Sequence, residues 1–370
     1  MAKLLEITGK AISGEWGQDD DTGTGIPVLR TTNFTNEGFV NYKNVVTRSI
    51  SKKNIAEKYL RHGDVIIEKS GGSDKQPVGR VIFFEGEENK YLFNNFTGLL
   101  RVQNPEEWLP KYVFYALYAY YRNGGTRAFE NRTTGLHNLQ VDNYVKSVDI
   151  PKLSYRKQQH ICETLDHVRD AVAYRERQLT KLDELVKARF VEMFGDPYTN
   201  SKDYPLKKGE SFFKLSNGKA VPESKRLNGG IPAYGGNGIS WYTDESLFDA
   251  DTIVVGRVGF QSGNVHLVKG PLWVTDNAMY MSSCDFSQYN LTFLIELMAH
   301  VDFTKFQDAG DLKKITQKPF MQFEYLCPPL SLQNQFAAFV AEVDKSKVEV
   351  QKALDQTQLL FDSLMQQYFG

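Results

Sequence analysis

The sequence predicts an α/β (α+β) protein in which two mixed α/β domains alternate with two long helices. Two observations lead to this fold class. The 370 residues contain an internal repeat, and each half of it ends in a long stretch without Pro or Gly. In both stretches the apolar residues follow one heptad in the same register. This pattern predicts two long helices that pair with each other as a coiled coil within one chain.

Residues 1–149 form the first predicted globular domain. The segment is rich in Gly, aromatic and β-branched residues and has short apolar runs. Val65-Ile66-Ile67 is typical of a buried strand, and Trp108 to Tyr121 is typical of a short helix. The sequence therefore predicts a mixed α/β domain here.

Residues 150–195 form the first predicted long helix. Its seam positions advance by alternating steps of four and three, and adding 175 to each number gives the seam of the second helix, within residues 327–370. A few seam positions are polar, namely Arg175 and Arg189 in the first helix and Lys347 and Thr357 in the second. Each helix of roughly 38 residues would be about 57 Å long and needs a partner along its length. We also considered that each helix packs on the globular domain before it. The predicted apolar seam consists of Ile161, Leu165, Val168, Val172, Leu179, Leu182 and Val186 in the first helix, and Phe336, Val340, Val343, Val350, Leu354, Phe361 and Leu364 in the second.

Residues 196–326 form the second predicted globular domain. Thr252 to Val255 is typical of a buried strand, and Leu291 to Val301 of a short helix. Two landmarks repeat from the first domain: Gly25-Ile26-Pro27 matches Gly230-Ile231-Pro232, and Gly63-Asp64-Val65-Ile66 matches Ala250-Asp251-Thr252-Ile253. The two domains thus share a plan and differ in detail.

Composition excludes several classes of protein. The net charge of -1 excludes a uniformly basic nucleic-acid coat protein, although positive charge can still be concentrated on the loops of the two domains. The 3 Cys form no CxxC pair, which speaks against a disulfide scaffold or a thiolate zinc site. No apolar stretch reaches membrane-spanning length, and the first residues lack the apolar core of a signal peptide. A cytoplasmic protein is expected.

The sequence shows no catalytic constellation. There is no GxxxxGK[ST] phosphate loop, HExxH motif or GxSxG elbow. The six His have no metal-ligand spacing, and Asp196-Pro197-Tyr198 lacks the second Pro of an amino-methyltransferase motif. Gly235 to Gly238 is read as a tight turn. We therefore expect no catalytic residue, no metal site and no cofactor bound by this chain.

Polar and basic loops occur in both globular domains and make double-stranded DNA the expected ligand. Arg, Lys, Asn and Gln can bond base edges, while Ser, Thr and Lys can hold phosphates. For any one of these residues, an ordinary exposed loop position is the simpler interpretation; their clustering in both repeats favours DNA. The candidate DNA-binding residues are Arg30, Thr31, Thr32, Asn33, Lys69, Ser70, Lys75, Arg127, Arg132 and Thr133 in the first domain, and Lys219, Lys225, Arg226, Tyr234, Asn237, Arg257, Asn264, Lys313 and Lys314 in the second.

With these features together, the chain resembles the specificity (S) subunit, HsdS, of type I restriction-modification systems. The resemblance rests on Thr133 to Leu136 leading to Ile150-Pro151-Lys152-Leu153, on the helix starts at Gln158 and Gln333, and on Phe190 to Gly195 at the helix end. Ile26 to Arg30, Ala233 to Ile239 and Val255 to Gly259 are similar to features of the family's recognition domains. Each motif is weak alone, but their order and duplication are specific.

The resemblance implies a division of labour. Residues 1–149 and 196–326 would be target recognition domains, each reading half of a bipartite, asymmetric DNA site. The helices would form an antiparallel coiled-coil spacer with pseudo-two-fold symmetry. Two methyltransferase (M) subunits that use S-adenosylmethionine on adenine, and restriction (R) subunits that use ATP and Mg, would dock on this non-catalytic chain in a prokaryotic cytoplasm.

Two other functions were weighed against this one. The chain could be a coiled-coil scaffold whose two domains bind proteins or glycans. A self-contained nuclease-methyltransferase is disfavoured by the absent motifs. Steep loss of binding with rising salt would separate a DNA reader from the scaffold.

Overall fold

The computed structural model describes residues 1–52, 55–133, 136–310 and 313–370, and the side chains of Arg132, Thr133 and Leu136 are outside the described set. The chain divides into two compact units. Unit 1 comprises Met1–Tyr174 and Leu354–Gly370, and unit 2 comprises Arg175–Ala353. Each unit therefore contains one globular part and a segment of each long helix. The functional boundaries at residues 149, 195 and 326 stay a prediction.

Unit 1 is centred on an antiparallel sheet of four strands in the order β2-β10-β6-β8. A second sheet has the order β3-β5-β4-β9, in which β4 and β9 run parallel. Smaller sheets join β11-β12-β7 and β1-β13. The strands are β1 Ala2–Lys3, β2 Ile12–Ser13, β3 Gln18–Asp19, β4 Ile26–Leu29, β5 Val46–Ser49, β6 Val65–Glu68, β7 Ser70–Gly71, β8 Val81–Phe83, β9 Leu92–Phe93, β10 Thr97–Leu100, β11 Glu130–Thr133, β12 Leu136–Leu139 and β13 Asp149–Ile150.

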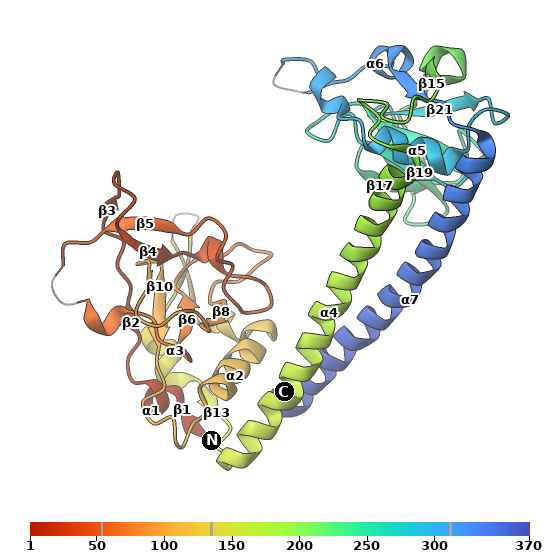
Figure 1. Ribbon diagram of the computed structural model, residues 1–370. Coiled ribbons are helices and arrows are strands. Elements are labelled where there is room, and N and C mark those ends of the chain that lie inside the picture. The colour runs from red at the N-terminus through yellow and green to blue at the C-terminus, as the bar shows by residue number, and fades with distance from the viewer. Residues whose placement is uncertain (53–54, 134–135, 311–312) are drawn as a thin grey trace. The chain divides into compact units, whose positions relative to one another are not determined.

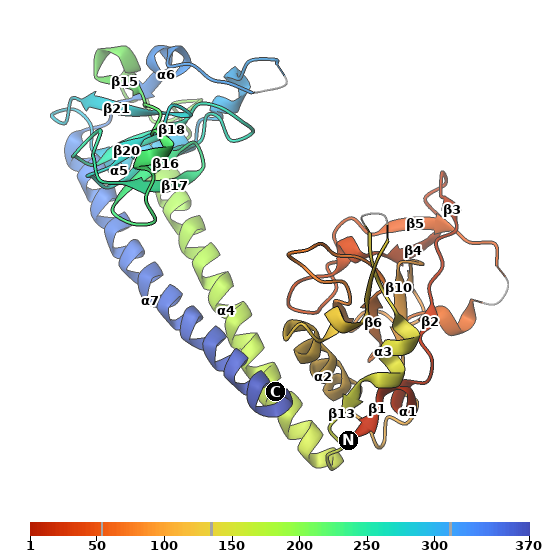
Figure 2. The same cartoon turned by 180° about the vertical axis from the view of Figure 1, so that it is seen from behind.

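A buried helix, α2 (Pro110–Arg122), covers the central sheet of unit 1 and packs on β8 (Figures 1 and 2). Pro110 opens the helix, where its missing N–H would have no intrahelical partner. Every residue from Tyr112 to Ala119 is buried, so this helix is part of the core. It confirms the helix predicted over Trp108 to Tyr121. The shorter helices are α1 Leu4–Thr8 and α3 Val141–Ser147.

Unit 2 repeats this architecture. Its central antiparallel sheet has the order β15-β21-β18-β19, and its second sheet has the order β17-β16-β20 with β16 and β20 parallel. α5 (Leu291–Ala299) packs on β19 and β18, and its N-cap Asn290 accepts from the Thr292 and Phe293 N–H groups. The remaining elements are α6 Lys318–Gln322 and strands β14 Leu206–Lys208, β15 Phe213–Asn217, β16 Ile231–Gly235, β17 Gly238–Thr243, β18 Thr252–Gly256, β19 Val265–Val268, β20 Trp273–Val274, β21 Ala278–Cys284 and β22 Glu324–Leu326.

The Ile-Pro landmarks occupy equivalent places in the two units. The Asn94 N–H donates to the Leu29 carbonyl, and the Thr275 N–H donates to the Tyr234 carbonyl, both at 2.9 Å. Leu29 and Tyr234 are 205 positions apart, the same spacing as the Ile-Pro landmarks. The internal repeat of the globular parts, inferred from these landmarks, is therefore present in the hydrogen-bonded frame.

The second predicted landmark is wrong by one residue. Lys69 and Arg257 follow β6 and β18, and each donates its backbone N–H to the residue just before β10 or β21, at 2.8 and 2.9 Å. Lys69 and Arg257 are 188 positions apart, so Val65 is equivalent to Ile253 and not to Thr252. Asp64 therefore corresponds to the buried Thr252, which donates to the Met281 carbonyl at 2.7 Å.

Both long helices are present, and each contains 40 residues: α4 Tyr155–Phe194 and α7 Leu330–Phe369. A buried glutamine anchors the first turn of each helix to its globular part. Gln158 accepts the Leu109 N–H at 2.8 Å, and Gln333 accepts the Asn290 N–H at 2.8 Å. Each amide also donates to two backbone carbonyls. The two glutamines singled out in the sequence therefore play the same structural role, 175 residues apart.

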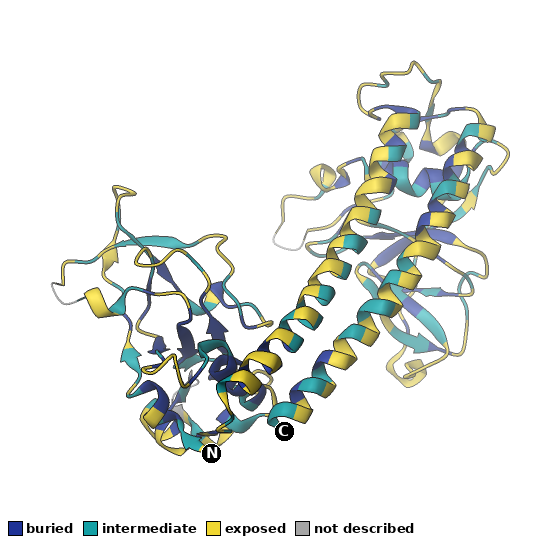
Figure 3. Cartoon of the chain, turned by 60° about the horizontal axis from the view of Figure 1, so that its bottom comes forward, coloured by how far each residue is buried: buried dark blue, intermediate teal, exposed yellow. Residues whose placement is uncertain are grey.

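The helices pack antiparallel within each unit. In unit 2, Phe190 meets Phe336 with ring centroids 5.6 Å apart, while Asp183 pairs with Lys347 at 2.7 Å, so one helix descends as the other ascends. In unit 1, Ile161 and Leu165 near the start of α4 join the same core cluster as Phe361 near the end of α7. Every predicted seam position is buried or half-buried, and exposed residues lie on the outer faces of the helices (Figure 3). This agrees with the predicted coiled coil.

The helix ends also belong to the globular cores. Ile161 and Leu165 cluster with residues of α2 in unit 1, and Phe336 and Val340 cluster with residues of α5 in unit 2. Packing on the preceding domain, which we weighed as an alternative to the coiled coil, therefore holds for the first turns of each helix. The two arrangements coexist because different turns of one helix serve each.

Candidate nucleic-acid interface

Arg257 lies at a backbone junction in unit 2, at the end of β18. Its N–H donates to the Asn277 carbonyl at 2.9 Å, and its carbonyl accepts the Ile315 N–H at 3.0 Å. The guanidinium makes one longer contact, from Nη1 to the Asp276 carbonyl at 3.4 Å. The backbone of Arg257 is therefore fixed on both sides while its half-buried side chain keeps unused donors.

Lys313, Lys314 and Asn264 join Arg257 on the same group of loops. The Gly259 N–H donates to the Lys313 carbonyl at 2.8 Å, and Lys314 forms an isolated bridge with Val258. The Gly256 N–H donates to the Asn264 carbonyl at 2.9 Å. Both lysine side chains are exposed and form no ion pair within the described parts of the chain. Predicted residues from distant segments are thus brought together here.

The glycine-rich turn between β16 and β17 packs on this junction. A Cβ atom added to Gly236 would lie 3.2 Å from the Gly256 Cα and 3.4 Å from the Asn277 carbonyl oxygen, so glycine allows the close approach. Asn237 at the turn is exposed, whereas Tyr234 is half-buried and packs on the core cluster around β18. Asn237 therefore remains a candidate, while the ring of Tyr234 mainly supports the turn. We call Asn237, Arg257, Asn264, Lys313 and Lys314 the unit 2 loop cluster.

The other three predicted residues of unit 2 differ in their surroundings. Lys219 is exposed, and its carbonyl accepts the Trp273 Nε1–H at 2.7 Å. Lys225 pairs with Glu245 at 2.6 Å, and this hydrogen bond raises the lysine pKa. Arg226 lies over the Trp241 ring, 4.1 Å from its centroid. Lys225 and Arg226 are therefore already engaged with neighbouring side chains and lie outside the loop cluster.

Lys69 occupies in unit 1 the place that Arg257 has in unit 2. Its N–H donates to the Phe96 carbonyl at 2.8 Å, and its carbonyl accepts the Leu139 N–H at 2.8 Å. The ammonium lies 3.3 Å from the Ser13 hydroxyl, and burial lowers the pKa of Lys69. Ser70 follows in β7 and bonds Asn138 through its side chain. Both units thus place a cation at the same backbone junction.

Two further predicted residues of unit 1, Arg127 and Lys75, lie close to Asp74, and Arg127 belongs to the short 3-10 helix Gly125–Phe129. Arg127 is exposed and donates from Nη2 to the Asp74 carbonyl at 3.3 Å. Lys75 is exposed beside Asp74. The backbone of Arg132 and Thr133 belongs to β11, but their side chains are outside the described residues. Thr134 and Gly135 of the family motif lie entirely outside the described residues.

The prediction for Arg30 to Asn33 is wrong for one residue, Asn33, which belongs to the 3-10 helix Thr31–Asn33. Asn33 is 1% exposed, and its amide donates to the carbonyls of Asn41 and Lys43 at 3.0 and 3.3 Å. Asn33 therefore shapes the loop and is removed from the contacting set. Arg30 is half-buried and donates to the Asn44 carbonyl at 3.3 Å, Thr31 is half-buried, and Thr32 is exposed.

Two residues that matter to this surface were missed in the sequence. Arg80 links the loops that carry Thr31 and Lys69, because it bonds the buried Glu68 carboxylate at 3.0 Å and the Thr31 carbonyl at 3.2 Å. Phe260 lies between residues that we did select and is 92% exposed. The role of Arg80 could not be found in the sequence, because its acidic partner lies twelve positions away and leaves no local pattern. Phe260 could have been found, because a Phe between Gly259 and Gly263 indicates an aromatic ring on an exposed turn.

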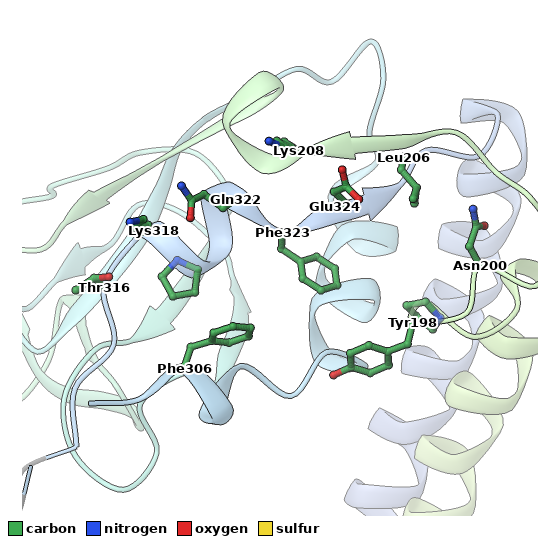
Figure 4. Close-up of a pocket in the computed structure, with 12 residues that line it drawn as sticks. Tyr198, Asn200, Leu206, Lys208, Phe306, Thr316, Lys318, Gln322, Phe323 and Glu324 are labelled. Carbon is green, nitrogen blue, oxygen red and sulfur yellow. The ribbon is translucent and has the colours of Figure 1, made fainter. Parts of the chain in front are cut away.

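A pocket of about 680 Å³ lies elsewhere in unit 2, and the rings of Tyr198, Phe306 and Phe323 surround it (Figure 4). Its charged lining groups are Lys208, Lys318 and Glu324. None of the predicted DNA-binding residues lines this pocket. Within the described residues, no group of three or more His, Cys, Asp or Glu is arranged to hold a metal ion, and no helix is long and apolar enough to cross a membrane.

Comparison with known proteins connects this frame to a family. Residues 202–357 match the family model described as the type I restriction modification DNA specificity domain. A putative type I restriction enzyme specificity subunit from Haemophilus influenzae is 23% identical over 120 residues, covering 32% of this chain and 31% of the relative. The EcoprrI specificity subunit from Escherichia coli is 23% identical over 113 residues, covering 30% and 28%. The matched region thus spans only 31% and 28% of the lengths of these two relatives.

Solved structures match the fold over the whole chain. The S subunit of a type I restriction-modification system from M. genitalium has a TM-score of 0.62 at 16% identity, covering 100% of this chain and 95% of that one. A chain from a study of complex assembly and conformational transition of the type I R-M system has a TM-score of 0.58 at 14% identity, covering 100% and 96%. The predicted fold class is confirmed, and so is the resemblance inferred from the repeat.

Proposed function

From the type I restriction-modification DNA specificity domain that this chain carries over residues 202–357, we propose that the chain selects the DNA site of a type I system by reading a bipartite, asymmetric sequence. Each unit reads one half-site. The observation that carries this proposal is the repeated junction, where Lys69 and Arg257 follow equivalent strands and are held by the same pair of backbone hydrogen bonds.

The loop cluster of unit 2 has the groups that such a reader needs. Arg257 and Asn264 can bond base edges, because guanidinium and amide groups match the donor and acceptor patterns of the major groove. Lys313 and Lys314 can hold phosphates and set the register of the protein on the duplex. The cluster is small compared with the whole surface, so a net charge of -1 is compatible with binding a polyanion.

The chain acts within a larger complex in this proposal. Two M subunits bring S-adenosylmethionine and transfer the methyl group to adenine, and R subunits bring ATP and Mg for restriction. The antiparallel helices act as the spacer between the two half-sites. The chain itself supplies the choice of site.

Salt dependence is the first test of this function. The chain, purified with its methyltransferase partner, is expected to bind duplex DNA. The logarithm of the binding constant should fall linearly with the logarithm of the salt concentration, because lysines and arginines that bind phosphates release the counterions of the DNA. Absence of salt-sensitive binding to any DNA pool would refute the proposal and favour the scaffold function.

Domain exchange is the second test. Replacing residues 1–149 by the same region of a relative should change one half-site and leave the other unchanged. Methylome sequencing of a host that carries the hybrid with its partners reads both half-sites at once. A hybrid that alters both half-sites would contradict the assignment of one half-site to each unit.

A further inference from the structure

Phe260 is the most exposed aromatic side chain that the structure describes in either unit, at 92%. It lies at the tip of the loop that joins β18 to β19, between Gly259 and Gln261. A phenylalanine in this position gains nothing from folding, because its ring stays in water in the folded chain. The ring is therefore available to a partner.

The loop that presents Phe260 is firmly held. The Ser262 N–H donates to the Gly259 carbonyl at 3.0 Å, and the Gly263 N–H donates to the Gly256 carbonyl at 2.8 Å. From outside the loop, Gln307 Nε2 donates to the Ser262 carbonyl at 2.7 Å. Gly259 and Gly263 have φ values of +96° and +99°, which side chains other than glycine rarely adopt. The exposed ring thus stands on a preorganised support.

The surroundings of Phe260 indicate the chemistry of its partner. The preceding residue, Gly259, donates its N–H to the Lys313 carbonyl at 2.8 Å, and Val258 is bridged to Lys314. Arg257 lies three residues before the ring in sequence. An apolar ring on a loop whose backbone is joined to those of Lys313 and Lys314, and which begins at Arg257, fits a polyanion with apolar groups between its charges. DNA has this character, because phosphates flank grooves that expose base edges and thymine methyl groups, and base faces become accessible where a base step is unstacked.

We propose that Phe260 is a specificity-determining residue of unit 2 and makes an apolar contact with a base in the DNA groove, while Lys313 and Lys314 hold the flanking phosphates. This inference rests on the proposed function and identifies the side chain that reads without hydrogen bonds. Two kinds of base contact share this chemistry. The ring can pack on a thymine methyl group, or it can insert between base pairs and unstack them.

The test uses the full chain with its methyltransferase partner and a duplex selected from a random pool by the unaltered complex. Phe260→Ala should weaken binding of the selected duplex about ten-fold or more. Binding to an unrelated duplex, and its dependence on salt, should stay unchanged, because the substitution removes no charge. Phe286→Ala is the matched control. Phe286 is 59% exposed and follows the C-terminal end of β21, whereas Arg257 is bonded to the residue just before the N-terminal end of that strand. The affinities of this variant for the selected and the unrelated duplex should therefore match those of the unaltered chain.

Modified DNA separates the two kinds of contact. Replacing single thymines of the selected duplex by uracil removes the methyl group, and one such position should reproduce the loss in Phe260→Ala if the ring packs on that methyl. If the ring inserts between bases, 2-aminopurine at the contacted step should become more fluorescent on binding the unaltered chain and not on binding Phe260→Ala. Either result supports the inference.

Three outcomes distinguish the possible failures. If the unaltered complex binds no DNA, the proposed function itself fails. If it binds and Phe260→Ala stays within two-fold on both duplexes, the role of Phe260 is refuted while the function stands. If Phe260→Ala leaves DNA binding intact but weakens association with the methyltransferase, the ring is a protein contact and the inference is overturned.

Discussion

Gln333→Ala is expected to destabilise unit 2 by about 2–6 kcal/mol, the summed cost of its three lost hydrogen bonds. The side chain is 0% exposed and makes three hydrogen bonds. Its Oε1 accepts the Asn290 N–H at 2.8 Å, and its Nε2 donates to the carbonyls of Gln288 and Pro328 at 2.9 and 2.8 Å. A buried N–H left without a partner costs about 1–3 kcal/mol, and each lost donor to a carbonyl costs about 0.5–1.5 kcal/mol.

Urea unfolding followed by circular dichroism measures the change in the free energy of unfolding. Hydrogen exchange gives the local readout. Asn290 is the N-cap residue of α5, and its backbone amide should exchange faster when its acceptor on Gln333 is removed. Gln335→Ala is the control, since Gln335 lies on the same helix and is exposed. It is expected to change the stability by less than about 0.5 kcal/mol.

Gln333→Glu separates hydrogen bonding from packing. Glutamate has the same size but, when ionised, offers only acceptors, so it would face the carbonyl oxygens of Gln288 and Pro328 with negative charge. We expect it to destabilise the unit at least as much as alanine does. A Gln333→Glu variant as stable as the unaltered chain, or an alanine variant that loses less than about 1 kcal/mol, would refute this account of the helix anchor.

Three other predictions follow from the same features. Arg257→Ala should weaken binding of the selected duplex by about 1–3 kcal/mol and relax specificity at one position in binding-site selection, and an equal loss on all duplexes would make it a phosphate contact. Inserting one heptad in both α4 and α7 lengthens each helix by about 10 Å. This should widen the unread gap between the two half-sites of the DNA and leave both half-sites unchanged, as methylome sequencing would show. A changed half-site would contradict the spacer role. Burial raises the pKa of Cys162 to about 12, so native Cys162 should resist alkylation at pH 8, as mass spectrometry would show. The contribution of Cys162 to the free energy of unfolding should fall as pH rises from the unfolded pKa near 9 towards 12. Rapid alkylation at pH 8 would show instead that the start of α4 opens.

The repeated helices could be predicted from the sequence because their signal is local and periodic. Each heptad seam repeats with an offset of 175 and no insertion, and a helix with one apolar stripe shows that stripe directly in its spacing. The Ile-Pro landmarks could be matched because proline restricts where a strand can run. These features survive even though the rest of the globular parts differ.

The residue-by-residue correspondence between β6 of unit 1 and β18 of unit 2 could not be predicted from the sequence, and the reason is physical. Both strands are buried on both faces. A strand buried on both faces has no alternation of apolar and polar residues, so its sequence does not show which residues share a face. The match of Asp64 with Asp251 looked convincing for this reason and proved to be shifted by one residue.

The candidate interface was predicted in part. Residue type alone could not separate an amide that presents itself to DNA from one that holds its own loop, and Asn33 belongs to the second kind. It also could not show that Lys225 has Glu245 as a partner twenty positions along the chain. Phe260 could not be predicted as a contact from hydrogen-bonding capacity or charge, because its apolar ring has neither.

Under the proposed function, the junction at Lys69 and Arg257 would let two units with one frame read different sequences. The hydrogen bonds that hold both residues use only backbone N–H and carbonyl groups. A frame held in this way accepts any side chain that fits, so lysine at one junction and arginine at the other cost the fold little. The buried glutamines at the helix starts differ, because their side chains themselves make the frame and therefore stay the same in both halves. The features that repeat thus build the scaffold. The side chains that differ at matching positions are the ones free to determine, in the proposed function, which bases each unit would read.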